Sequence, residues 1–150
     1  MKIKSLLILF ATGLLTVSLA AAEAAKTVAI TASDNLRFSV TEIKAAPGES
    51  LHIQLHNVGT MPKDVMGHNW ILLVAGENPD TYAAAALSAK AENYEPPALK
   101  AKVLAAIALL GPGETGDVTF TAPTVPGKYP FLCSFPAHCA AGMRGVLVVK

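Results

Sequence analysis

The chain has 150 residues, of which 52% are hydrophobic, and this length and apolar content fit one domain with an adequate core. If Lys2 and Lys4 are removed with an N-terminal leader, 10 of the 12 basic residues remain against 11 acidic ones, a net charge of about −1. No basic run or patch interleaved with aromatic residues occurs, so nucleic acid is excluded as an expected partner.

The first residues have the pattern of a secretory signal. A short basic start precedes an apolar run over 5–19, and small residues around Ala22 and Ala24 offer cleavage sites. The apolar run is too short for a membrane-spanning anchor. We therefore expect a signal peptide over 1–22, cleaved after Ala22 or Ala24, and a mature domain over 23–150 in a bacterial periplasm without a membrane anchor. A retained N-terminal anchor is the alternative.

Short segments of alternating apolar and polar residues follow, separated by turn residues. Such alternation predicts half-buried β-strands. In chain order, strands are expected at 26–31, 36–40, 42–45, 50–56, 71–74, 117–121, 128–132 and 144–150. Short strands at this spacing predict an all-β fold, a Greek-key β-sandwich.

The region 75–116 interrupts this pattern. Asn78 can cap a helix with Pro79 at its first position, and alanine dominates 81–92, which predicts a helix that ends before the following proline pair. The Ala, Leu and Lys content of 99–110 also favours a helix by propensity. The whole insert is expected to lie on the sandwich as a helical flap without a chemical role.

Near the C-terminus, three potential metal ligands lie between two predicted strands. Cys133, His138 and Met143 fall within eleven residues, in a loop that can bring all three donors to one point. One thiolate with imidazoles in a plane and a weak sulfur above it suits copper that cycles between two oxidation states. Structural zinc usually takes several equivalent thiolates or histidines, which this loop does not supply.

The loop needs a second imidazole from elsewhere in the chain. The strict alternation of 50–56 places His52 and His56 on the polar face of a strand, where solvated side chains are expected. His68 instead follows a glycine and precedes the apolar run 71–74, so it stands at the mouth of a strand. His68 is therefore predicted as the second histidine ligand.

Two segments carry a resemblance to a known family. Met-Gly-His-Asn-Trp at 66–70 and Cys-Ser-Phe-Pro-Ala-His at 133–138 resemble the two copper-binding segments of azurin-like blue (type 1) copper proteins, members of the cupredoxin family. The resemblance extends through 61–64, and from 111–114 to 118–120, so it covers nearly the whole mature chain. The paired motifs in this order are highly specific.

This resemblance implies a cupredoxin fold and one copper ion that cycles between Cu(I) and Cu(II). It implies three ligands in one plane, namely His68, Cys133 and His138. It also implies Met143 as a long axial ligand and the backbone carbonyl oxygen of Gly67 as a weak contact on the opposite side.

The resemblance further implies a hydrogen-bonded frame around the ligands. Asn69 would tie the two ligand loops together, and the backbone N–H groups of Asn69 and Phe135 would donate to the Cys133 sulfur. For 99–110, the resemblance implies an extended chain, whereas composition favours a helix, so both conformations stay open.

The spacing in the C-terminal loop departs from azurins. Azurins have three residues between the second histidine and the methionine, whereas four residues separate His138 from Met143 in this chain. The ending over 141–145 looks more like that of plastocyanins and related cupredoxins. The axial geometry of Met143 depends on this spacing. The assignment of the three ligands in the plane does not depend on it.

The two cysteines could form a disulfide in an exported protein. Cys133 and Cys139 lie six positions apart on one loop, so a bridge would stabilise the fold very little. It would also remove the thiolate that the metal site requires. We therefore expect free thiols. Cys139 is expected as a small packed or partly exposed residue, and the resemblance implies that it is not a ligand.

These features predict a periplasmic one-electron carrier that works between redox proteins and is not an enzyme. An enzyme such as a copper nitrite reductase needs a second, open metal site, and His52 and His56 alone cannot build one. A copper-binding module for delivery or storage is the alternative, because it would use the same donors.

The carrier hypothesis needs a surface where partners can dock. Nearly uncharged residues surround His138, and an exposed apolar patch there would suit brief contacts with redox partners such as c-type cytochromes or a terminal reductase. The residues expected in this patch are Met66, Phe135, Pro136, Ala137, Ala140 and Ala141. Packing of these residues against the flap is the alternative.

Overall fold

The structure is a computed structural model that describes residues 24–150. The predicted signal peptide over 1–22 lies outside the described residues. Within 24–150, no helix is both long enough and apolar enough to cross a membrane.

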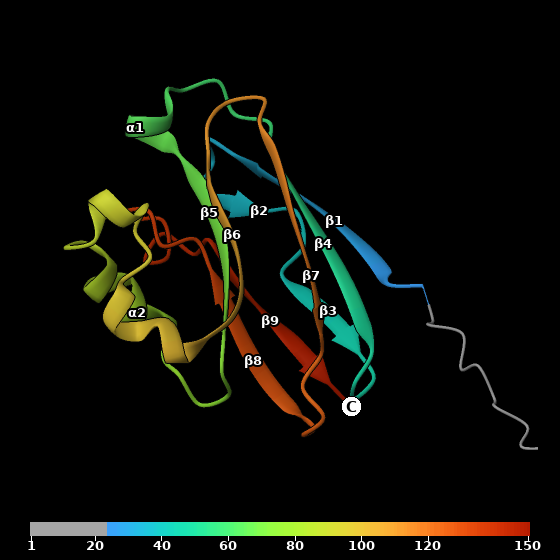
Figure 1. Cartoon of the computed structure of the whole chain (residues 1–150). Coiled ribbons are helices and arrows are strands. Elements are labelled where there is room, and N and C mark those ends of the chain that lie inside the picture. The colour runs from blue at the N-terminus through green and yellow to red at the C-terminus, as the bar shows by residue number, and fades with distance from the viewer. Residues whose placement is uncertain (1–23) are drawn as a thin grey trace, which may run out of the picture.

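Two β-sheets pack face to face in the described part of the chain (Figure 1). Their strands are β1 (Lys26–Ser33), β2 (Arg37–Phe38), β3 (Glu42–Ala45), β4 (Ser50–Asn57), β5 (His68–Leu73), β6 (Val103–Leu110), β7 (Thr115–Thr121), β8 (Gly127–Leu132) and β9 (Arg144–Val149). The four-stranded sheet has the order β2-β1-β4-β7, and the five-stranded sheet has the order β3-β9-β8-β5-β6. The predicted all-β sandwich is confirmed.

Alternation in the sequence translates directly into burial in β4. Its aliphatic residues face the core between the sheets, and His52 and His56 lie on the opposite, solvent-facing side. The Nε2 atom of His52 lies 3.0 Å from a carboxylate oxygen of Asp117 on β7. Both histidines are therefore sheet-surface residues, as predicted.

Strand β5 is buried at all six of its positions. Trp70 and Leu72 pack in the core between the sheets, whereas Ile71 and Leu73 pack with Tyr82 of the flap on the outer face. A strand that is covered on both faces has a continuous apolar sequence. This double cover explains why the run shows no alternation.

The flap lies on the outer face of the five-stranded sheet and begins with helix α2 (Pro79–Ala86) (Figure 1). The Asn78 side-chain oxygen accepts hydrogen bonds from the backbone N–H groups of Asp80 at 2.8 Å and Thr81 at 3.4 Å, so the predicted cap is present. The helix ends at Ala86, and the prediction that it continues to residue 92 is wrong.

Tertiary contacts hold the chain after this helix in a reversal. A 3-10 turn, Lys90–Glu92, follows it, and Asn93 and Tyr94 then adopt left-handed φ angles of 55° and 63°. This reversal turns the two carbonyl groups toward Asn69 and Ser134, which donate hydrogen bonds to them. These bonds stabilise the left-handed conformation at Asn93 and Tyr94, which a continuing helix could not contain.

The stretch 99–110 contains both of the conformations that the sequence left open. A second 3-10 helix, Pro97–Lys102, leads into β6, which pairs antiparallel with β5. The extended conformation implied by the resemblance is therefore correct for most of this stretch. The helical conformation favoured by propensity occurs only at its beginning. A one-turn helix α1 (Lys63–Met66) also precedes β5, at a place where the sequence predicted no helix.

Candidate metal centre

The three predicted ligands in the plane come together in the structure. The donor atoms of His68, Cys133 and His138 all lie within 4.8 Å of one another, and all three residues are buried. The Cys133 sulfur lies 3.4 Å from Nδ1 of His138, and the two imidazole centroids are 4.9 Å apart. The mid-chain histidine was thus predicted correctly.

Strand pairing brings these residues together. Strands β5 and β8 are antiparallel neighbours with Ile71 opposite Leu132, so Cys133, just beyond β8, returns toward the start of β5. His68 is the first residue of β5. His138 lies in the loop between β8 and β9, which packs beside the flap (Figure 1).

A glycine lets the chain enter β5 at the required place. A Cβ atom on Gly67 would lie 2.6 Å from the carbonyl oxygen of Lys63 and 2.9 Å from the side chain of Leu109. Both contacts are shorter than side-chain carbons tolerate, so only glycine allows α1 and β6 to pack this closely around the residue before His68.

The loop after Cys133 is closed by its own backbone. The N–H of Cys133 donates to the carbonyl oxygen of Met143 at 3.0 Å. The N–H of Met143 donates to the carbonyl oxygen of His138 at 2.9 Å. The guanidinium of Arg37 donates to the carbonyl oxygen of Ala141 from the neighbouring strand β2. Met143 is completely buried in the same core cluster as Cys133. Its axial role, like that of the Gly67 carbonyl, stays a prediction.

Asn69 connects the two ligand segments. Its amide nitrogen donates to Ser134 Oγ at 2.8 Å, and its amide oxygen accepts from the Ser134 backbone N–H at 2.8 Å. Ser134 Oγ donates in turn to the carbonyl oxygen of Tyr94 in the flap at 2.6 Å. Sequence reasoning placed Asn69 correctly but missed Ser134 and Tyr94. A small polar residue beside the cysteine was the available signal for Ser134.

Burial controls the protonation of the donors. It raises the pKa of the Cys133 thiol to about 12, against the lowering effect of the Asn69 and Phe135 backbone N–H groups that hydrogen-bond the sulfur. Burial, and then repulsion by His68, lowers the pKa of His138 to about 4. Burial also lowers the pKa of His68, with partial opposition from Asp34. At neutral pH both imidazoles are therefore uncharged and able to coordinate.

The donor set fits copper. Neither ring nitrogen of His68 has a hydrogen-bond partner in the described structure, although both are buried, and such atoms are normally satisfied. A metal ion would satisfy one of them and would also make the thiolate form of Cys133 favourable. One thiolate and two imidazoles are the equatorial donors of blue-copper sites.

The metal-free protein is expected to lose stability as the pH falls below about 6.5. The folded-state pKa values of both ligand histidines lie below their ordinary value, so the unfolded chain binds protons more readily. The stability from neutral His138 is present above its unfolded pKa of 6.5 and is lost as the pH falls toward about 4. The full shift corresponds to about 3 kcal/mol, which solvent screening at the ring edge reduces to about 2 kcal/mol.

Urea denaturation of the metal-free protein between pH 7 and pH 4 measures this loss. The matched variant is His138→Gln, in which the residue cannot titrate, and its stability should depend less steeply on pH. Identical slopes in the two proteins would contradict this origin of the pH dependence.

The expected docking patch is only partly exposed. Ala137 and Ala140 are exposed, while Met66, Pro136 and Ala141 are partly buried. The expectation that Phe135 belongs to the exposed patch is wrong, because it is only 7% exposed and therefore adds almost no surface. Its ring packs edge-on against Tyr94 of the flap, with centroids 5.0 Å apart, and lies 4.7 Å from the His138 ring.

Leu87, at the end of α2, extends this surface and was missed from the sequence. It is 57% exposed and lines a shallow hollow with Ala84, Ala137 and Ala140. Only the folded flap brings it beside the ligand loop, so no local sequence signal could have identified it.

Both cysteines are free, as expected. Cys133 belongs to the core between the sheets, whereas Cys139 packs in the outer cluster with Tyr82 and Leu132. The Cys139 sulfur lies 3.6 Å from a carboxylate oxygen of Asp80. Its place is therefore structural, on the side of the loop that faces the flap.

Comparison with known proteins agrees with this geometry. The family described as copper binding proteins, plastocyanin/azurin family, matches residues 24–150. Azurin of Pseudomonas aeruginosa is 33% identical over 140 residues, which cover 91% of this chain and 92% of that azurin. Auracyanin-B of Chloroflexus aurantiacus is 34% identical over 131 residues, which cover 83% of this chain but 52% of the relative, so the chain spans about half of that relative's length.

Solved structures give the same result. Auracyanin A of Chloroflexus aurantiacus, a blue copper protein, aligns with a TM-score of 0.74 and 35% identity over 85% of this chain and 100% of that chain. Reduced auracyanin of Roseiflexus castenholzii aligns with a TM-score of 0.74 and 32% identity, over 85% of this chain and 99% of that chain. This chain therefore belongs to the plastocyanin/azurin family and is a blue copper cupredoxin, a type 1 copper electron-transfer protein that binds one copper ion with His68, Cys133 and His138.

Proposed function

We propose that this protein is a diffusible one-electron carrier of the periplasm that works between redox proteins and has no catalytic activity. The observation that carries the proposal is the buried Cys133, His68 and His138 donor set, whose two segments Asn69 joins by hydrogen bonds. Copper, when bound, supplies a one-electron couple. A site whose ligands are already together and buried needs little rearrangement when the copper ion is oxidised or reduced.

The surface around His138 supports an exit route for the electron. His68 and Cys133 have no exposed surface, whereas His138 is 3% exposed and lies next to the exposed Ala137. We propose that partners, such as c-type cytochromes or a terminal reductase, dock on the apolar surface formed by Ala137, Ala140 and Leu87, beside the ion pair of Asp80 with Arg144. Such a small contact is short-lived, which suits a carrier that must release its partner.

Replacing Ala137 with Glu is expected to slow electron exchange and leave the blue absorption unchanged. The new side chain would place a charge in the proposed contact surface, and its burial on docking would be unfavourable. Stopped-flow reduction by a c-type cytochrome and the electron self-exchange rate measure the effect. Ala85→Glu on the exposed side of α2 is the matched control, because Ala85 does not line the hollow beside the ligand loop. Equal rates in both variants would exclude this docking surface.

Copper delivery or storage is the alternative, because it would use the same donors. The hydrogen bonds from Asn69 and Phe135 to the Cys133 sulfur favour the carrier, since they stabilise a retained thiolate. Cu(II) added to the purified mature protein should give an intense blue thiolate absorption that a one-electron reductant removes reversibly. A colourless product, or copper that a weak chelator removes quickly, would favour delivery.

The non-catalytic part of the proposal has its own support. His52 is paired with Asp117, and the described residues gather no third ligand around His52 and His56. The periplasmic location is supported by the secretory pattern of the N-terminal sequence. Mass spectrometry of the protein from a periplasmic extract tests it, with mature chains that begin at residue 23 or 25 as the expected result.

A further inference from the structure

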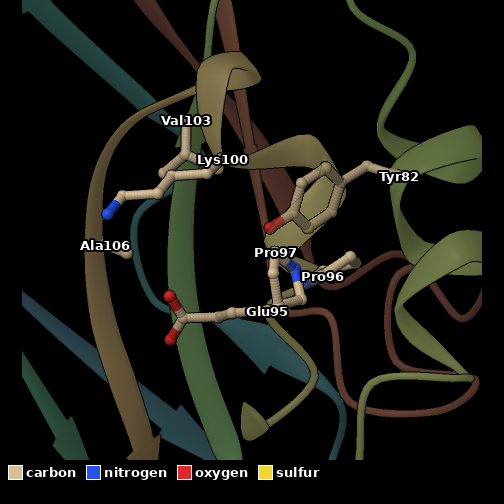
Figure 2. Close-up of a pocket in the computed structure, with 7 residues that line it drawn as sticks. All are labelled: Tyr82, Glu95, Pro96, Pro97, Lys100, Val103 and Ala106. Carbon is tan, nitrogen blue, oxygen red and sulfur yellow. The ribbon is translucent and has the colours of Figure 1, made fainter.

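A pocket of about 500 Å³ lies between the flap and the outer face of β6, and none of the metal ligands lines it (Figure 2). Its walls are largely apolar and come from Pro96, Pro97, Val103 and Ala106. This volume falls within the usual range for pockets that bind small ligands. The metal centre therefore leaves the pocket without an assigned role.

Two polar groups in this pocket have no partner. Tyr82 is only 3% exposed, and its hydroxyl is directed into the pocket near Pro97 (Figure 2). Glu95 is partly buried and extends its carboxylate along the lower side of the pocket (Figure 2). Within residues 24–150, neither the Tyr82 hydroxyl nor the Glu95 carboxylate takes part in a side-chain hydrogen bond or an ion pair.

The protonation behaviour of the two groups is consistent with this isolation. Burial raises the pKa of Glu95, because the charged carboxylate is partly removed from water. Burial, and then the charge of Glu95, raises the pKa of Tyr82 to about 12. Both groups line the same pocket, and each can accept a hydrogen bond from a ligand bound there (Figure 2).

We propose that this pocket binds an ammonium group carried on an apolar stem, with the Glu95 carboxylate as counter-ion and the Tyr82 hydroxyl as a second acceptor. An anion would be repelled by Glu95, and a neutral apolar ligand would bury the carboxylate without compensation. The proline and aliphatic walls match an apolar stem. This binding is separate from the copper centre and from the proposed electron transfer.

Lys100 also lines the pocket, and its side chain supplies a control. Its ammonium group extends toward the same side of the pocket as the Glu95 carboxylate, but within residues 24–150 the two side chains form no ion pair (Figure 2). A positive charge at the rim weakens the attraction of an incoming cation. Lys100→Met keeps the apolar stem and removes this charge, so it should tighten binding.

Titration of the copper-loaded, reduced protein with n-butylammonium chloride at constant ionic strength tests the proposal by two-dimensional NMR. Saturable shifts are expected at the backbone amides of residues 82, 95 and 106, whereas n-butanol should give none. Glu95→Gln keeps the size of the side chain, and it should weaken binding about tenfold. Tyr82→Phe should weaken it less.

A blocked peptide, N-acetyl-Ala-Lys-Ala-amide, distinguishes the source of the ammonium group. Tighter binding of the peptide than of n-butylammonium assigns the pocket to a lysine of a partner protein, and the reverse assigns it to a small amine. The proposal is overturned if neither compound gives saturable shifts, or if Glu95→Gln binds as tightly as the parent protein. It is also overturned if binding occurs only in Lys100→Met, because Lys100 itself then fills the pocket.

Discussion

Replacing Cys133 with serine is expected to abolish the blue absorption of the copper-loaded protein. The absorption arises from the thiolate–copper bond, and Cys133 is the single sulfur in the described group of three clustered donors. A serine hydroxyl in the same buried place is a harder ligand with a much higher pKa, so it does not form the corresponding bond at neutral pH. Loss of a residue that hydrogen-bonds a ligand typically lowers metal affinity by about 10- to 100-fold. Loss of the ligand itself should lower copper affinity by more than this.

The other cysteine offers a matched control for this variant. Cys139 is also buried and free, but it faces the outer cluster beside Asp80. Cys139→Ser should therefore keep the blue absorption and one copper per chain, at some loss of stability. Absorption spectra and copper analysis of both variants measure the difference. Blue colour in Cys133→Ser, or its loss in Cys139→Ser, would contradict the ligand assignment.

The ligands could be predicted from the sequence because their signals are local. Cys133, His138 and Met143 lie on one loop between two strands, and that loop needs only one distant partner. The alternation of apolar and polar residues excluded His52 and His56 as candidate ligands, since it placed them on the outer face of β4. The glycine before His68 marked the remaining candidate, and the steric contacts of Gly67 explain why that glycine is required.

The flap could be predicted only in part, because its conformation depends on distant contacts. The cap at Asn78 is local and was identified, whereas the chain reversal at Asn93 and Tyr94 is held by hydrogen bonds from Asn69 and Ser134. The strand conformation of β6 likewise results from its pairing with β5. An alanine-rich sequence favours a helix, but pairing with distant strands determines whether a helix forms.

The same limit applies to the surface around the metal centre. The sequence showed that the loop around His138 is nearly uncharged, but it could not show which of its residues the flap covers. Phe135 packs against Tyr94, and Leu87 takes a place in the exposed surface instead. Composition therefore indicates the chemical character of such a surface, and tertiary packing determines its members.

Replacing Asn69 with alanine is expected to destabilise the fold and to loosen the metal centre. The Asn69 side chain makes three hydrogen bonds, two with Ser134 and one with the carbonyl oxygen of Asn93 at 3.3 Å. Their loss leaves the buried N–H of Ser134 unsatisfied, so the free energy of unfolding of the metal-free protein should fall by about 3 kcal/mol. Copper should also leave about 10- to 100-fold faster in the presence of a chelator.

Asn57→Ala separates these two effects. Asn57 is also buried, and its side chain donates to the carbonyl oxygen of Leu110 at 3.1 Å and accepts from the N–H of Gly59 at 2.9 Å. Its side chain links the end of β4 to the end of β6 and forms no hydrogen bond with Cys133 or Ser134, so its loss should destabilise the fold without shifting the blue absorption. The two variants should therefore lose similar stability in chemical denaturation. They should differ in their absorption spectra and in the rate at which a chelator removes copper. If both variants release copper equally fast, Asn69 contributes general stability alone, and the positioning of the ligand segments must come from the backbone of the loop.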